Sequence, residues 1–215
     1  MEFHRSFYNK PFSEIIKMAA SRSHTPGGGS VSAMCGIMGA TMAEMVANLT
    51  VSKAGYEGVS GELTDLIAAL EKGIEEMKIL TMEDMDAFDR LLKAYRLPKT
   101  TDKEKEERLK EIQRATILAA TVPLNIALKS VEILKINRRL ADIGNISVLS
   151  DSVVSSVLLD AAVRGAVVSV DQNSGCIKDP SVKSDVEGKR RSVVDESQKI
   201  MEETIAVVYA KELKL

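Results

Sequence analysis

The stretch Val-Val-Ser-Ser-Val-Leu-Leu-Asp-Ala-Ala-Val-Arg-Gly-Ala-Val-Val-Ser-Val, residues 153–170, is the most apolar part of the chain and decides its fold class. Asp160 and Arg164 interrupt it, and two charges within such a short apolar run favour a buried core helix over a membrane-spanning one. Ser150 and Asp151 precede the stretch and are good N-cap residues. We therefore expect a long, nearly fully buried central helix in a soluble protein.

The composition of the rest of the chain predicts an all-α protein. Aromatic residues make up 4% of the sequence and tryptophan is absent, whereas the strong helix formers Ala, Leu, Met, Glu and Lys are abundant. Apolar periodicity predicts further helices over residues 11–22, 30–51, 61–95, 101–140 and 182–214. Thr101 and Glu104 have the spacing of a capping box, and Pro123 is expected to kink the helix that follows. We expect a single-domain bundle of about six helices over residues 1–215.

Charge and cysteine content narrow the classes of partner. The chain has 29 Lys+Arg and 31 Asp+Glu, a formal net charge of −2. A chain with this charge has no strong positive electrostatic potential to attract nucleic acid or an acidic membrane. Residues 1–5 carry no apolar run of the kind that a secretory signal needs. Cys35 and Cys176 lack the Cys-x-x-Cys spacing of zinc or redox sites. We expect a cytoplasmic protein without a metal site and without a nucleic-acid or membrane partner.

Three consecutive glycines, Gly27, Gly28 and Gly29, stand directly before Ser30 and a strong helix. Glycine runs cost backbone entropy, so their position needs an explanation, and one explanation is a close approach of the backbone to a ligand. The free N–H groups and the positive dipole end of the following helix suit a carboxylate, a phosphate or a developing oxyanion. The Gly-Lys-Ser/Thr of a nucleotide-binding P-loop is absent. The alternative is a tight turn between two helices.

Asp84 interrupts the apolar face of the helix predicted over residues 61–95. That face otherwise carries apolar residues at three- and four-residue steps, namely Met77, Leu80, Phe88, Leu91 and Tyr95. A carboxyl on this face would be partly desolvated, which raises its pKa toward the range that suits proton transfer. The alternatives are an exposed edge position or a buried hydrogen-bond acceptor. Lys99, in the loop after Pro98, could reach an anionic ligand or simply be solvated.

Several segments occur in an order and spacing that resemble one enzyme family. They are Thr25–Ala33, Ala43–Thr50, Asp84–Phe88, Tyr95–Lys99, Val122–Leu124, Gly144–Asn145 with Ser150–Asp151, and the stretch Gly165–Asp179. Together they span most of the chain and resemble the formimidoyltetrahydrofolate cyclodeaminases, a family that includes small methenyltetrahydrofolate cyclohydrolases. The resemblance implies an all-helical homodimer that binds a tetrahydrofolate, polyglutamylated or not, in a cleft near the glycines. It implies no metal or redox cofactor.

The same resemblance assigns roles to particular residues. In the cyclodeaminase reaction N10 of 5-formimidoyltetrahydrofolate attacks the formimidoyl carbon, and ammonia leaves to give the methenyl bridge. Asp84 would move the proton or stabilise the cationic product, and Lys99 would hold the glutamate tail or an oxygen of the reacting group. The residues expected to bind substrate are Gly27, Gly28, Gly29, Ser30, Asn48, Asn145, Ser150, Asp151 and Asn173.

Two other functions remain open at this stage. One is 5,10-methenyltetrahydrofolate cyclohydrolase, which would use the same pterin site for attack by water. The other is a non-catalytic helical module that binds folate or a protein, with the glycines serving only as a turn; a buried Asp84 argues against it, because an apolar residue would serve a structural core better. A chain of 215 residues leaves no room for a formimidoyltransferase domain, so we expect it to act alone or with a separate partner.

Overall fold

The computed structural model describes residues 7–212, and within that range the chain forms helices and no strand. Two short 3-10 helices, η1 (Glu57–Val59) and η2 (Ile146–Val148), lie in turns. Six α-helices lie wholly within the described range: α2 (Phe12–Ala19), α3 (Gly28–Val51), α4 (Ser60–Tyr95), α5 (Asp102–Ile143), α6 (Leu149–Ser174) and α7 (Pro180–Glu212). The all-α prediction is confirmed.

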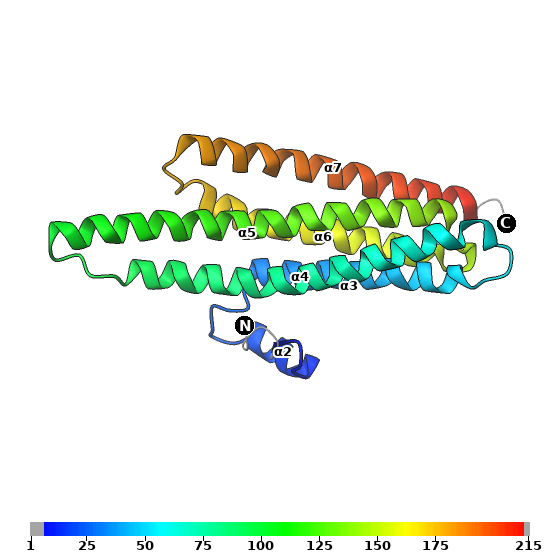
Figure 1. The fold of residues 1–215 in the computed structure, drawn as a ribbon, viewed down its shortest axis with the longest axis horizontal. Helices are drawn as coiled ribbons and strands as arrows, with labels where there is room; N and C mark the ends of the chain where they lie inside the picture. Colours follow the sequence, from blue (N-terminus) through cyan, green and yellow to red (C-terminus); the bar gives the residue numbers. More distant parts are fainter. Residues whose placement is uncertain (1–6, 213–215) are drawn as a thin grey trace.

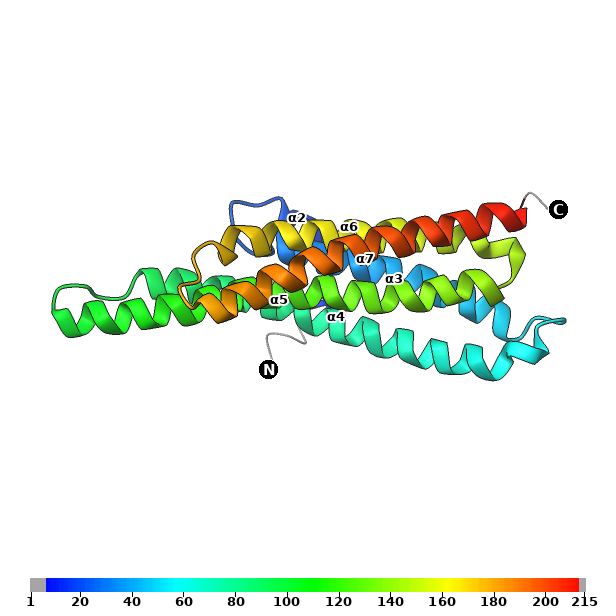
Figure 2. The ribbon, with the colours of Figure 1, turned by 90° about the horizontal axis from the view of Figure 1, so that it is seen from above.

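Four long helices, α3 to α6, run side by side, and α7 packs on α5 and α6 (Figure 1). The short helix α2 lies outside this group, where Ile15 packs with Met82 and Met85 of α4. The turn between α4 and α5 projects well beyond the beginning of α3, as Figure 2 shows from above. A separate small core holds this projecting hairpin together, made of Leu91, Ala94, Ile112, Ala115 and Ala119. The hairpin end of α4 is thus remote from the glycines.

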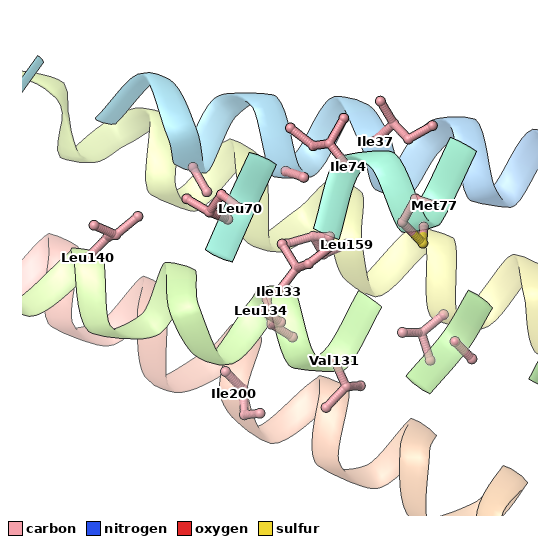
Figure 3. Packing of buried hydrophobic residues seen from close by; sticks show 14 of the residues in the cluster. Ile37, Leu70, Ile74, Met77, Val131, Ile133, Leu134, Leu140, Leu159 and Ile200 are labelled. Carbon is pink, nitrogen blue, oxygen red and sulfur yellow. The ribbon is translucent and has the colours of Figure 1, made fainter. Parts of the chain in front are cut away.

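The main core is built from apolar residues of α3, α4, α5, α6 and α7, with Leu70, Met77, Ile133 and Leu159 among its buried members (Figure 3). Small residues of α3 let the neighbouring helices come close. A Cβ built on Gly39 would lie 2.8 Å from Leu159 Cγ, so a larger residue there would push α6 away. Gly36, Ala40, Ala43 and Ala47 of α3 are also small and buried, and small residues at this spacing allow such a close approach.

Helix α5 begins with the predicted capping box: the Glu104 N–H donates to Thr101 Oγ1 at 3.2 Å, and the Thr101 N–H donates to Glu104 Oε2 at 2.8 Å. The helix continues from Asp102 to Ile143 as one element through Pro123, where we expected a kink. Proline has no N–H to offer the carbonyl four residues earlier, which belongs to Ala119. That carbonyl accepts instead from Asn173 Nδ2 at 3.1 Å, so α6 satisfies the group that Pro123 leaves unpaired.

Helix α6 is buried on one side and exposed on the other, so the expectation of near-complete burial was too strong. Val154, Val157 and Val168 are exposed. The buried charge that interrupts its apolar run is satisfied, since Asp160 accepts from Arg164 Nε at 2.6 Å and from Ser197 Oγ at 2.8 Å. By length and apolar composition alone, α3, α5 and the stretch Ile146–Ser174 could each cross a membrane, yet half or more of each apolar stretch is buried inside the bundle.

Candidate functional site

Asp84 of α4 and Ser30 of α3 form the centre of the candidate site. Ser30 is fully buried in the first turn of α3, and its Oγ donates to Asp84 Oδ2 at 2.6 Å. The Ser30 backbone N–H hydrogen-bonds to the same carboxyl group. Asp84 therefore occupies the positive N-terminal end of α3. The sequence predicted an anionic ligand or a developing oxyanion at this helix end, whereas the structure places there a carboxylate of the chain itself.

The close approach of Asp84 explains why the third glycine of the run is a glycine. A Cβ built on Gly29 would lie 2.2 Å from Asp84 Oδ1 and 2.8 Å from Oδ2. The neighbouring Gly28 has no such restriction, because the nearest atom to its Cβ position is Ser169 Oγ at 3.9 Å. The structure thus shows the backbone approaching the Asp84 carboxylate at Gly29, whereas the predicted approach of the glycine run to a ligand stays a prediction.

Burial raises the pKa of Asp84, and the hydroxyl and N–H of Ser30 partly oppose this rise. The predicted direction of the pKa shift is confirmed. A carboxyl whose pKa lies nearer to neutrality than that of a solvated aspartate is better matched to accepting and then returning a proton. The alternative of an exposed edge position is excluded by the burial of the group.

Two further features lie on the segments that carry Asp84 and the glycines, an aromatic pair and a cavity. The ring centroids of His24 and Phe88 lie 5.8 Å apart. In the sequence, His24 shortly precedes the glycine run, and Phe88 follows Asp84 by about one helical turn. A cavity of about 910 Å³ lies along a different face of α4, lined by residues that include Met82, Asp86 and Arg90 but not Asp84. Within residues 7–212, no group of three or more His, Cys, Asp or Glu side chains is arranged to hold a metal ion.

The structure does not bring Lys99 to Asp84. Tyr95, the last residue of α4, lies about 16 Å from Asp84 along the helix, at roughly 1.5 Å per residue. Lys99 follows in the exposed turn at the end of the projecting hairpin. A role for Lys99 at the same reacting atom as Asp84 of its own chain is therefore wrong on grounds of distance, whereas contact with a long glutamate tail stays a prediction.

Four of the predicted substrate-binding residues lie at the opposite end of the bundle. Asn48 is near the end of α3, about 30 Å from Gly28 at roughly 1.5 Å per residue. Asn145, Ser150 and Asp151 lie at the turn before α6 and in its first turn, beside that end of α3. Asp84 and these residues do not form one site within a single chain.

Lys53, which no sequence pattern marked as a functional residue, forms hydrogen bonds at this opposite end of the bundle. Lys53 Nζ donates to Asn145 Oδ1 at 2.7 Å, and the Asn145 N–H donates to Thr50 Oγ1 at 2.9 Å. No periodicity marks Lys53, because it lies in the turn after α3. The expectation that Ser150 or Asp151 caps α6 was also wrong, since that helix begins at Leu149 and Asn145 caps η2 instead, accepting from the Ser147 N–H at 3.1 Å.

Asn173 is at the same end of the bundle as the glycines, because Ser169 of the same helix lies close to Gly28: its Oγ would be 3.9 Å from a Cβ built there. Its amide donates to the Ala119 carbonyl at 3.1 Å and to the Ser169 carbonyl at 2.8 Å. Both donor hydrogens thus have partners within the protein. This structural role accounts for the asparagine, and its predicted contact with substrate stays a prediction.

Known proteins are similar to this chain in sequence and in fold. The profile of the family described as formiminotransferase-cyclodeaminase matches residues 11–192. The methenyltetrahydrofolate cyclohydrolase of Methylorubrum extorquens is 34% identical over 80% of this chain and 82% of its own length. The formimidoyltransferase-cyclodeaminase of Gallus gallus is 29% identical over 90% of this chain, which spans only 36% of that longer protein. The crystal structure of formiminotetrahydrofolate cyclodeaminase from Thermotoga maritima superposes with a TM-score of 0.86 and 28% identity, covering 94% of this chain and 98% of that one.

Proposed function

Because the chain belongs to the formiminotransferase-cyclodeaminase family, we propose that it is a folate one-carbon enzyme that closes 5-formimidoyltetrahydrofolate to 5,10-methenyltetrahydrofolate and releases ammonia. Its similarity to the Thermotoga maritima cyclodeaminase over nearly the whole of both chains supports this activity. The observation that carries the proposal is the buried Asp84 carboxyl, held by Ser30 against Gly29.

The reaction needs one group that accepts a proton and then gives it back. N10 attacks the formimidoyl carbon, the N10–C bond forms, and the N10 proton must leave. The formimidoyl group reacts in its protonated, amidinium form, so the attack leaves an NH2 group on the carbon. This nitrogen gains the proton that N10 loses, and the bond between it and the carbon breaks with the departure of ammonia. Asp84 takes the proton from N10 and delivers it to the departing nitrogen, while its charge favours the cationic methenyl product. These steps balance without a metal or a redox cofactor.

Ser30 and Gly29 prepare Asp84 for this role. The hydroxyl of Ser30 fixes Oδ2, so the carboxyl group keeps one orientation. Gly29 has no side chain, and this leaves the room that Oδ1 occupies beside the first turn of α3. Holding a proton-transfer group in its working orientation lowers the entropic cost of the reaction.

A second candidate activity is 5,10-methenyltetrahydrofolate cyclohydrolase. The similarity to the Methylorubrum extorquens cyclohydrolase, at 34% identity over 82% of that protein, favours it. Here water attacks the methenyl carbon and Asp84 accepts a proton from the water. Asp84 returns this proton to N5 as the bond from carbon to N5 breaks, and the remaining hydroxyl proton is lost to solvent as the formyl group of 10-formyltetrahydrofolate forms. Both activities need the same folate site and the same carboxylate.

One pair of assays separates these activities. Purified protein is added to 5-formimidoyltetrahydrofolate and, separately, to 5,10-methenyltetrahydrofolate, while methenyl absorbance and ammonia are followed. A rise in absorbance with ammonia release supports the cyclodeaminase, and a loss of absorbance supports the cyclohydrolase. Catalysis of neither reaction, together with unchanged folding, contradicts the proposal and leaves a binding module. Asp84→Asn should lose about 100-fold or more of kcat while still binding folate.

We also propose that the enzyme works as a homodimer in the cytoplasm, on folates with one or several glutamates. Exposed apolar residues on α3 and α6, such as Met38 and Val157, support association. Cys35 and Cys176 are both free thiols, which suits a reducing compartment. A monomeric mass by light scattering at micromolar concentration would contradict the dimer.

A further inference from the structure

An apolar stripe runs along the outer side of α3 from its first turn to its last. Its members follow one another at alternating steps of four and three residues, the spacing of a coiled-coil seam: Val31, Cys35, Met38, Met42, Met45 and Leu49. Val31 is 44% exposed, Met38 52% and Leu49 50%. The stripe contains no charged residue. Such a seam is typical of a helix that packs against another helix.

Helix α6 carries a similar stripe beside it. Val154, Val157, Ala161 and Val168 lie on its outer side and are exposed. The two stripes adjoin, because Cys35 Sγ of the first donates to the Leu158 carbonyl of α6 at 3.3 Å. We call these two stripes together the α3/α6 face.

The stripe on α3 is symmetric about Ala40. Val31 and Leu49 are equally distant from Ala40 in the sequence, as are Cys35 and Met45, and Met38 and Met42. An identical helix running in the opposite direction would therefore meet each apolar position with another apolar position. Isologous two-fold contacts require this kind of self-complementary surface.

The charges on α6 fit the same symmetry. Gly39 of α3 lies against Ser155 and Leu159 of α6, so the centre of the α3 stripe is level with Val157 and Leu158. Asp151 and Arg164 are equally distant from that point in the sequence and carry opposite charges. A two-fold axis there would set Asp151 of one chain level with Arg164 of the other, which suits a second copy of this chain better than an unrelated apolar partner.

We propose that the α3/α6 face binds a second copy of the chain with its α3 antiparallel, and that Lys53 and Asn145 of the partner subunit complete the site of Asp84. Gly27 and Lys53 are equally distant from Ala40, so the same axis brings Lys53 of the partner subunit level with the glycine run. Lys53 is already held by its bond of 2.7 Å to Asn145. It supplies the site with a cation that can bind an oxygen or a carboxylate of the substrate. The assignment of folate to this site rests on the proposed function.

A shared site explains how the predicted substrate residues can lie at two distant ends of one chain. Asn48, Asn145, Ser150 and Asp151 are about 30 Å from Gly28 within a chain, at roughly 1.5 Å per helical residue. In the antiparallel dimer they lie at the glycine end of the partner. A dimer whose two-fold axis ran parallel to the helices would place the glycine end of one chain beside the glycine end of the other, far from Asn145 of either chain. Such a dimer would contradict the proposal.

Disulfide trapping tests the arrangement without using activity. Met45→Cys in a Cys176→Ser background should form a covalent dimer on mild oxidation, by pairing with the native Cys35 of the partner subunit. Removing Cys35 by Cys35→Ser from that variant should abolish the cross-link. Glu44→Cys is the matched control, since it lies next to Met45 but outside the seam, and should cross-link far less. Equal cross-linking of both variants, or a monomer in sedimentation, would overturn the proposed interface.

Mixed dimers test whether the site is shared. Asp84→Asn and Lys53→Met homodimers should each be impaired. After they are unfolded together and refolded, half of the dimers are mixed, and each mixed dimer has one site with both native residues. Activity should then rise to about one quarter of the wild-type value under random pairing. Activity no higher than the mean of the two parents would contradict the shared site. If trapping succeeds while wild-type protein converts neither folate, the interface stands and the proposed function fails.

Discussion

The carboxylate of Asp84 fills the space that a side chain on Gly29 would need, since a Cβ built there would lie 2.2 Å from Oδ1. These two residues come from different helices, α3 and α4, and are far apart in the sequence. The glycine run and the buried carboxylate therefore belong to one structural unit. The glycine allows α3 to begin directly against the group that we propose to carry the proton.

Gly29→Ala should displace the Asp84 carboxylate and lower kcat/KM by about 100-fold, because a misplacement of about 1 Å is costly for a positioned catalytic group. Gly28→Ala is the matched control, as its Cβ would meet only Ser169 Oγ at 3.9 Å. Steady-state kinetics of the two variants, with circular dichroism to verify folding, gives the comparison. Equal activity of the two variants would show that Asp84 tolerates displacement.

Ser30→Ala should move the acidic limb of the kcat/KM profile to higher pH. The Ser30 hydroxyl lowers the pKa of Asp84, so its removal lets burial raise that pKa further. Asp84 must be ionised to accept the N10 proton, and activity then falls at a higher pH than in the wild type. Ser32→Ala serves as the control, because Ser32 Oγ donates to the Gly28 carbonyl and not to Asp84. An unshifted limb in Ser30→Ala would remove Asp84 from the proton-transfer step.

Asp84→Asn should raise the free energy of unfolding above that of the wild type at neutral pH, and this gain should be much smaller in acid. Burial raises the pKa of Asp84 in the folded state, so the folded protein binds more protons than the unfolded chain between the two pKa values. Wild-type stability therefore falls as pH rises from the ordinary aspartate pKa through the raised one, and asparagine lacks this penalty. Urea unfolding across that pH range measures the difference. A stability loss in the variant at every pH would identify Asp84 as only a structural cap of α3.

Asn173→Ala should lower the free energy of unfolding by about 1–3 kcal/mol, because the Ala119 carbonyl loses its donor. In a Pro123→Ala background the loss should be smaller, since alanine restores an N–H that can bond to Ala119 within α5. A double-mutant cycle in urea measures this coupling. Additive effects of the two substitutions would show that Asn173 does not compensate for Pro123. A large rise in KM for Asn173→Ala would support its predicted contact with substrate.

Local sequence was sufficient for most of the helix boundaries. The limits of α4 agree within one residue with the prediction, because Leu97-Pro98 ends the helix and the apolar period is regular. The capping box at Thr101 and the place of Asp84 on an apolar face also depend only on residues three or four positions apart. Helix geometry is a local property, so short-range spacing determines it.

Only the tertiary structure decided which distant residues meet. Periodicity does not reveal that Asp84 lies against Gly29, that Asn173 satisfies the carbonyl freed by Pro123, or that Lys53 binds Asn145. It also does not reveal that the turn between α4 and α5, which contains Lys99, projects beyond the rest of the bundle. Sequence by itself determined the helices, the apolar faces and the residue types able to carry the chemistry. Packing decided their distances, because contacts between helices depend on how whole side-chain surfaces fit together and not on spacing within any one helix.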